Sequence, residues 1–174
     1  VGTLPQPQDV MNSKRSWRPG DGMLLSIGQG PVTVSPIQLA RCIAAIANGG
    51  KLLKPRLIIE AGQETPDQGT SILPLQPETL AFLDEGLQRA VSDPDGMAHD
   101  SLYLESLGIA GLVATGEATG RQVDHAWCAA YAPAAHPRVA VVVALEHGGD
   151  GAGSAGPLVK RLLRFMHGVG LFGS

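Results

Sequence analysis

The chain has 174 residues, of which 44% are hydrophobic, enough for the core of one domain or of part of a larger one. Its net charge of -3 and aromatic content of 4% argue against nucleic acid as a partner, because neither a basic stripe nor a set of stacking rings is present. Apolar runs such as Val139 to Leu145 are far shorter than the roughly 20 residues that span a bilayer, which predicts a soluble piece.

The first 35 residues, 1–35, predict a loop region. Residues 1–22 are rich in proline, glycine, glutamine and asparagine and show no sustained periodicity. Domains seldom begin on such a stretch, so we expect this loop to enter from further upstream in a longer chain.

Residues 36–106 predict a mainly helical part. Ser35 and Gln38 form a capping box around Pro36, and apolar residues then recur at helical spacing, which predicts a helix over 36–47. Turn chemistry and spacing assign the remaining segments: an edge strand at 51–60, a loop at 61–74, a helix from Pro77 to the turn at 92–96, and a short helix at 97–104.

Residues 107–174 predict three strands and a C-terminal helix. The strand signals lie at 107–115, 126–131 and 138–146, and the linkers between them are too short for parallel crossovers, so we expect antiparallel pairing. Helical spacing of apolar residues predicts an amphipathic helix over 157–167. The predicted fold class is therefore α+β, with an antiparallel sheet packed against helices.

Residues 151–156 match the GxGxxG pattern of a dinucleotide-binding turn. Such a site needs a second parallel strand after the helix and an acidic residue about 20 positions further on, and the sequence ends within that distance. We therefore interpret these glycines as a tight loop that carries the chain from the last strand back over the sheet.

The cysteines and histidines are not spaced like metal ligands. Cys42 and Cys128 are predicted to be buried free thiols, the usual state of such cysteines. The five histidines form no HExxH pattern, so we predict no metal and no cofactor. Asp124 and His125 are neighbours on a predicted strand and point to opposite faces, so we expect no acid–base pair there.

Short motifs in a specific order run along almost the whole chain. They include Gly20-Asp21, Ser26-Ile27-Gly28-Gln29-Gly30, Val34-Ser35-Pro36-Ile37-Gln38-Leu39-Ala40, Ala45-Ile46-Ala47-Asn48-Gly49-Gly50, Ile109-Ala110-Gly111, His125-Ala126-Trp127 and Glu146-His147-Gly148-Gly149. In this order and spacing the motifs resemble those of penicillin-binding protein transpeptidases. In that family a GD...SIGQG segment leads into a helix that begins T/S-P-x-Q-x-A and ends A-N-G-G.

The resemblance implies the C-terminal part of the transpeptidase fold, within the serine D,D-transpeptidase and β-lactamase-like superfamily. It implies acyl transfer in peptidoglycan cross-linking, in which the serine of an SxxK motif attacks a stem peptide ending in D-alanyl-D-alanine, a donor that β-lactams mimic. Neither SxxK nor SxN occurs in this sequence. In the family both precede the SIGQG segment, so we expect residues 1–174 to form a partial domain that catalyses nothing by itself.

The third motif of the family, KTG, falls in the first predicted strand and is altered. Without gaps, Leu112, Val113 and Ala114 stand at its three positions, whereas a second register with two extra residues places Ala114, Thr115 and Gly116 there. Both registers lose the lysine, whose ammonium binds the substrate carboxylate in the family, and neither leucine nor alanine can donate a hydrogen bond from its side chain.

The resemblance implies Thr115, Gly116 and Ala114 as substrate-binding residues and no catalytic residue within the chain. Thr115 could offer its hydroxyl to a carboxylate and its N–H to an oxyanion hole, or could be an ordinary strand threonine. Trp127 is expected in the core.

Two interpretations remain open: a fragment of an active transpeptidase, and a degenerate transpeptidase fold that serves as a scaffold or partner-binding module. The expected partners are the missing N-terminal half of the domain, a stem peptide or β-lactam in the parent protein, and a second copy of the fragment. The resemblance also implies an extracytoplasmic location and a membrane anchor upstream.

Overall fold

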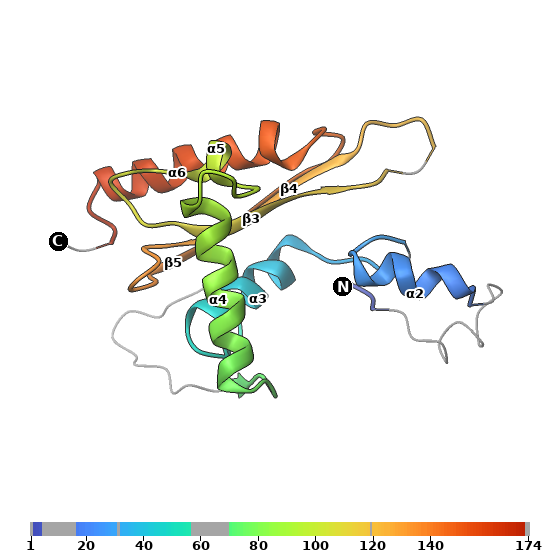
Figure 1. The fold of residues 1–174 in the computed structure, drawn as a ribbon, viewed down its shortest axis with the longest axis horizontal. Coiled ribbons are helices and arrows are strands. Elements are labelled where there is room, and N and C mark those ends of the chain that lie inside the picture. Colours follow the sequence, from blue (N-terminus) through green and yellow to red (C-terminus); the bar gives the residue numbers. More distant parts are fainter. Residues whose placement is uncertain (1, 5–16, 31, 57–69, 119, 173–174) are drawn as a thin grey trace.

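Two layers of helices enclose a central antiparallel sheet (Figure 1). The computed structural model describes residues 2–4, 17–30, 32–56, 70–118 and 120–172.

The central sheet has the strand order β3-β4-β5, with β3 at Ala110–Gly116, β4 at His125–Ala132 and β5 at Val139–Leu145. Both pairings are antiparallel, and the register sets Thr115 of β3 opposite Ala126 of β4. The predicted α+β class with antiparallel strands is therefore confirmed. The short linkers leave room for hairpins only, as the spacing indicated.

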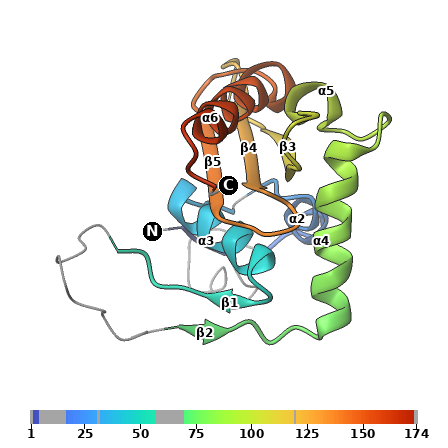
Figure 2. The same ribbon diagram turned by 90° about the vertical axis from the view of Figure 1, so that its left-hand side faces the viewer.

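Helices cover both faces of this sheet (Figures 1 and 2). Helix α6 (Gly156–Gly168) and the short α5 (His99–Leu102) pack together on one face. Helix α3 (Pro36–Ala47) packs against β5 on the other face, and α4 (Pro77–Ser92) stands beside β3. Alternate residues of each strand therefore enter different helical layers.

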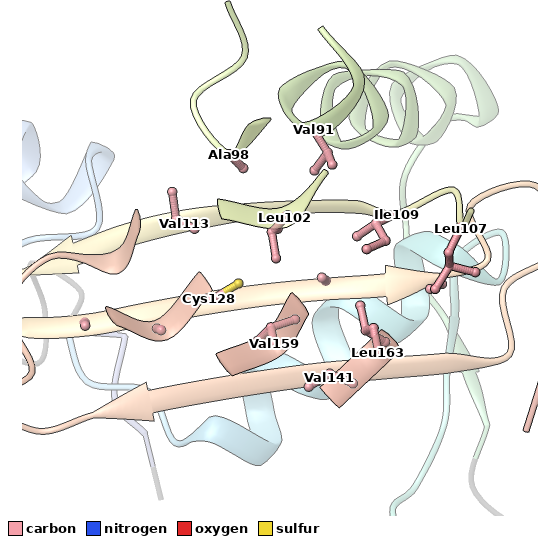
Figure 3. Close-up of a cluster of buried hydrophobic side chains, with 14 of the residues drawn as sticks. Val91, Ala98, Leu102, Leu107, Ile109, Val113, Cys128, Val141, Val159 and Leu163 are labelled. Carbon is pink, nitrogen blue, oxygen red and sulfur yellow. The ribbon is translucent and has the colours of Figure 1, made fainter. Parts of the chain in front are cut away.

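The larger buried cluster lies between the sheet and α6 (Figure 3). Cys128 of β4 and Val113 of β3 point into it from the sheet, while Val159 and Leu163 enter from α6 and Leu102 from α5. Cys128, Val159, Leu163 and Leu102 are each fully buried. Removal of several aliphatic side chains from water gives the main stabilisation of this layer, at roughly 1.5 to 3 kcal/mol for each large one.

A second cluster fills the opposite layer. Ile43 of α3 and Leu87 of α4 are buried against Tyr131 of β4, and the half-buried Leu112 of β3 packs on the same group. The hydroxyl of Tyr131 donates a hydrogen bond to the carboxylate of Asp84 on α4. This bond satisfies a polar group that would otherwise be costly to bury.

The N-terminus of α3 forms the predicted capping box. The N–H of Gln38 donates to the Ser35 hydroxyl, and the N–H of Ser35 donates to the Gln38 side-chain oxygen at 3.0 Å. These local bonds occupy N–H groups that a helix leaves unpaired, which explains why the sequence identified the start of this helix.

The prediction of a loop throughout residues 1–35 is wrong at α2 (Pro19–Ser26). Pro19 occupies the first helical turn, and the carboxylate of Asp21 accepts a hydrogen bond from the N–H of Arg18 at 3.0 Å. Both features favour a helix N-terminus. The two glycines within α2 lower its helix propensity and hid it from the sequence pattern.

The segment between α3 and α4 also differs from expectation. Strand β1 spans only Lys51–Leu52, and it pairs antiparallel with β2 (Ser71–Ile72), inside the stretch predicted as a loop. Pro55 lacks an N–H for pairing, which is consistent with the early end of β1. The rest of the predicted loop lies largely at 57–69, outside the described residues.

The glycine-rich run at 151–156 forms a π-helical turn, η1 (Gly151–Ala155), which leads directly into α6. The predicted tight loop is therefore wrong. A Cβ atom at Gly151 would collide with Ala114 and would lie 2.6 Å from the carbonyl oxygen of Trp127. Glycine is needed here so that the turn can lie directly on the backbones of β3 and β4.

The two cysteines have different surroundings. Cys128 is fully buried, as predicted, and burial raises the pKa of its thiol to about 12. Cys42 is exposed, so its predicted burial is wrong. It follows Arg41 on α3 and precedes Ile43, whose side chain faces the sheet, so the apolar spacing of the helix does not include it.

Candidate functional site

Strand β3 presents the altered motif to two different surroundings. Val113 belongs to the cluster under α6, and the hydroxyl of Thr115 accepts a hydrogen bond from the N–H of Gly151 at 3.3 Å on that same face. Leu112 points to the opposite face and packs against the cluster of α3 and α4. Ala114 shares the face of Leu112 by strand alternation and is exposed.

The alternation places both candidate lysine positions on one face of the sheet. Leu112 is half-buried among apolar side chains, whereas Ala114 is open to solvent. A cation at 112 would lose part of its hydration among these apolar side chains, while a cation at 114 would keep it. The two alignments of the motif are therefore physically unequal, although the sequence treats them alike.

The motif at Ser26–Gly30 meets the end of β3 through one side chain. The Nε2 of Gln29 donates to the carbonyl oxygen of Thr115 at 3.0 Å, and its Oε1 accepts from the N–H of Glu117 at 3.2 Å. Sequence reasoning did not select Gln29 as a site residue. Its place inside a family motif was the available signal, but nothing local showed which strand it would contact.

A cavity of about 750 Å³ opens beside this contact, between the Ser26–Gly30 motif and the adjoining ends of the strands. Gly116, one of the three predicted substrate-binding residues, lines it. Ala114 and Thr115 are its neighbours on β3 but are not among the lining residues. Trp127, expected in the core, is half-buried and lines the cavity instead.

The charged side chains around the cavity are acidic. Glu117 and Glu146 line it together with His125. Among the described residues that form its wall there is no lysine or arginine. The ionisable side chains of the described cavity wall are therefore two carboxylates and one imidazole.

The side chains of His125 and His147 lie together where β4 begins and just after β5 ends. The rings of His125 and His147 have centroids 4.9 Å apart, and the N–H of His147 donates to Nδ1 of His125 at 3.1 Å. Nδ1 of His147 lies 2.8 Å from the carbonyl oxygen of Val123. His147 takes a φ of 55°, a left-handed conformation that is uncommon outside glycine.

The other polar groups near these strands hold loops in place. The carboxylate of Asp124 accepts from the N–H of Ala118 at 3.0 Å, so Asp124 and His125 bind different partners, as expected for neighbours on a strand. Within the part of the chain that the structure describes, no group of three histidine, cysteine, aspartate or glutamate residues is arranged to hold a metal ion.

Tyr131 is the other buried titratable group of the sheet. Burial and the neighbouring Asp84 carboxylate raise the pKa of its phenol above the usual value of 10.0. Asp84 also accepts a hydrogen bond from Gln88 at 3.1 Å. This buried cluster joins α4 to β4 and does not contribute to the lining of the cavity beside Gln29.

Comparison with known proteins adds the family context. The family model described as the penicillin-binding protein transpeptidase domain matches residues 3–164. The peptidoglycan D,D-transpeptidase MrdA of Salmonella typhimurium is 28% identical over 171 residues, which cover 86% of this chain and 27% of the relative. PbpA of Mycolicibacterium smegmatis, also called a peptidoglycan D,D-transpeptidase, is 30% identical, covering 75% of this chain and 28% of the relative.

Solved structures agree. The chain is 35% identical to PBP2 of Pseudomonas aeruginosa, with a TM-score of 0.78 over 93% of this chain and 36% of that one. It is 26% identical to PBP2 of Helicobacter pylori, in a complex with MreC, with a TM-score of 0.85 over 98% of this chain and 32% of that one. The chain spans about a quarter of the length of the curated relatives that it matches.

Proposed function

Because the chain belongs to the penicillin-binding protein transpeptidase domain family, we propose that it supplies the C-terminal part of a peptidoglycan D,D-transpeptidase domain. In the proposed reaction a serine elsewhere in the protein attacks the D-alanyl-D-alanine peptide bond, and D-alanine leaves. An amine of a second stem peptide then resolves the acyl-enzyme and forms the cross-link. No serine of this sequence has SxxK spacing, so the role proposed for this chain is to bind and orient the donor peptide.

One observation supports this role above the others: two family motifs that are far apart in sequence meet at one cavity. Gln29 joins the Ser26–Gly30 motif to the end of β3 by two hydrogen bonds, and Gly116 of β3 lines the cavity beside that contact. Strand β3 is an outer strand, so its edge can pair with an extended peptide. The substrate-binding roles of Thr115, Gly116 and Ala114 remain part of this proposal.

A degenerate, non-catalytic scaffold is the second candidate, and the charge of the site favours it. Leu112 replaces a lysine in one alignment and packs against apolar side chains, and Ala114 replaces it in the other. The described cavity lining includes two glutamates and no lysine or arginine. A peptide carboxylate would meet repulsion there instead of a cation.

Labelling of the full-length protein with a fluorescent penicillin separates the two candidates. An active transpeptidase forms a stable serine adduct that survives denaturing gel electrophoresis, and an unlabelled penicillin abolishes the signal. A correctly folded protein that forms no adduct at saturating probe would contradict the catalytic proposal and leave the scaffold. Mass spectrometry of the labelled peptide identifies the serine.

The proposed main partner of this chain is the remaining part of its own domain. Strand β5 is the other outer strand of the described sheet, and beside it α6 carries an exposed apolar stripe. The stripe follows helical spacing and consists of Leu158, Leu162, Phe165 and Val169. An open strand edge next to an apolar helix flank suits an added strand and helix, and the same surface would support self-association of the isolated chain.

We further propose an extracytoplasmic location for the full-length protein, because its proposed substrate is cell-wall peptidoglycan. No helix in the described ranges has the length and apolar character needed to cross a bilayer. A membrane anchor elsewhere in the full-length protein is part of this proposal. The Helicobacter pylori complex with MreC supports a further protein partner for the full-length protein.

A further inference from the structure

The carboxamide of Gln29 forms hydrogen bonds with two backbone groups at the end of β3 that point away from β4. It binds the carbonyl oxygen of Thr115 and the N–H of Glu117, at 3.0 and 3.2 Å. Successive residues of a strand point their backbone groups alternately to its two sides, so these are groups that a neighbouring strand would use. The side chain thus stands where a further strand would pair.

Only a short part of this edge of β3 is accessible. At the start of the strand, Ala110 and Gly111 are buried where α4 packs. Ala114 and Thr115 are exposed. Because the carbonyl of Thr115 points away from β4, its N–H points the same way and faces the open edge. The accessible stretch therefore ends at Gln29.

A well-defined turn presents Gln29. Its N–H donates to the carbonyl oxygen of Leu24 at 2.9 Å, which ties it to the last turn of α2. Gly28 and Gly30 on either side take φ values of 72° and 80°, which favour glycine. With the backbone held on both sides, the side chain has less freedom left to lose when it binds β3.

We propose that Gln29 is a positioning residue that fixes the register in which an extended peptide pairs with β3. The peptide binds the N–H of Thr115 and the strand edge that precedes Thr115 on β3. The carbonyl of Thr115 and the N–H of Glu117 are not open to the peptide, because Gln29 already binds both. A bound chain therefore cannot slide toward Glu117. The nature of the peptide, a stem peptide ending in D-alanyl-D-alanine, rests on the proposed function.

Hydrogen exchange at single amides tests this proposal in the full-length protein, with and without a synthetic pentapeptide ending in D-alanyl-D-alanine. In Gln29→Ala the amide of Glu117 should exchange about five- to tenfold faster, in line with the loss of one hydrogen bond. In the unaltered protein the pentapeptide should protect the amide of Thr115 and leave Glu117 unchanged. In Gln29→Ala it should protect both.

Gln122→Ala is the matched control, since Gln122 is exposed in the loop before β4 and no described hydrogen bond involves it. Exchange at the buried Cys128 amide reports whether each variant is folded. The proposal is overturned if Gln29→Ala leaves Glu117 exchange unchanged, or if the pentapeptide protects Glu117 in the unaltered protein. If the pentapeptide protects no β3 amide in either protein, the proposed function is overturned instead. The proposed peptide register is then overturned as well, because it depends on that function.

Discussion

The hydroxyl of Thr115 accepts a hydrogen bond from the backbone N–H of Gly151 at 3.3 Å. This bond joins the altered motif strand to the first residue of the π-helical turn, on the sheet face opposite Ala114. Two patterns that the sequence presents separately, the changed KTG motif and the glycine-rich run, therefore meet in one structural contact.

Replacement of Thr115 by valine should lower the free energy of unfolding by about 1 kcal/mol, because the Gly151 N–H loses its acceptor while the side chain keeps its shape. Thr115→Ser keeps the hydroxyl and should change stability by less than about 0.5 kcal/mol. Urea denaturation measures both values. Equal stability of the two variants would show that the Gly151 contact contributes nothing.

Gly151→Ala should destabilise the protein by about 2 kcal/mol or more. The added Cβ atom would lie 2.6 Å from the carbonyl oxygen of Trp127 and 2.7 Å from the nitrogen of Ala114, both backbone atoms of paired strands. The matched control is Gly86→Ala in α4, where a Cβ atom would meet no heavy atom within 4 Å. That variant should gain about 0.5 to 1 kcal/mol from helix propensity. Equal thermal stability of Gly151→Ala and Gly86→Ala would contradict the close approach of Gly151 to β3 and β4.

Lysine at 112 and lysine at 114 should have opposite outcomes. Leu112→Lys places an ammonium against Ile43 and Leu87 and should cost about 2 to 4 kcal/mol of unfolding free energy. Ala114→Lys adds a solvated cation at an exposed position and should change stability by no more than about 0.5 kcal/mol.

Only the lysine at 114 should increase labelling of the full-length protein by a fluorescent penicillin, because it supplies the missing positive charge without unfolding the strand. Stronger labelling with the lysine at 112 than at 114 would favour the gap-free alignment and contradict this prediction.

Cys128 should make the protein less stable in alkali. Its thiol has a pKa of about 12 in the folded protein against 9.0 for an unhindered thiol, owing to burial. Because the pKa is higher in the folded protein, the unfolded chain loses the thiol proton at a lower pH than the folded protein does. The contribution of the protonated Cys128 thiol to the free energy of unfolding is therefore fully present below about pH 9. It is lost as the pH rises toward about 12.

The slope from this thiol is at most about 1.4 kcal/mol per pH unit. Cys128→Ala should reduce the fall in unfolding free energy between pH 8 and pH 11, whereas Cys42→Ala, at the exposed thiol, should preserve it. A thiol reagent should modify Cys42 in the native protein and reach Cys128 only after unfolding. Rapid native labelling of both thiols would contradict the burial of Cys128.

Phe165→Glu should weaken self-association of the chain, because Phe165 is 65% exposed within the apolar stripe of α6. Phe82→Glu is a matched control on α4, where Phe82 is 76% exposed on a different helix. Sedimentation velocity over a range of concentrations should show a smaller assembly only for Phe165→Glu. If both variants and the unaltered chain behave as monomers, the proposed association is wrong.

The sequence by itself determined the family, the antiparallel sheet and the helices whose signals are local. The capping box of Ser35 and Gln38 depends on residues three positions apart, and the strands follow from apolar runs separated by short linkers. Patterns between residues this close in the sequence can be recognised without knowledge of the fold. They failed at α2, where glycines weaken the helical pattern, and at η1, where a glycine run resembles a loop.

Tertiary structure alone decided which groups surround the altered motif. Gln29 reaches β3 across 86 residues, and no local pattern encodes that contact. Leu112 and Ala114 are equivalent in sequence as lysine replacements, but helix packing buries one and leaves the other exposed. Exposure and long-range hydrogen bonds depend on how the layers pack together, which is why the loss of the lysine was visible in the sequence and its surroundings were not.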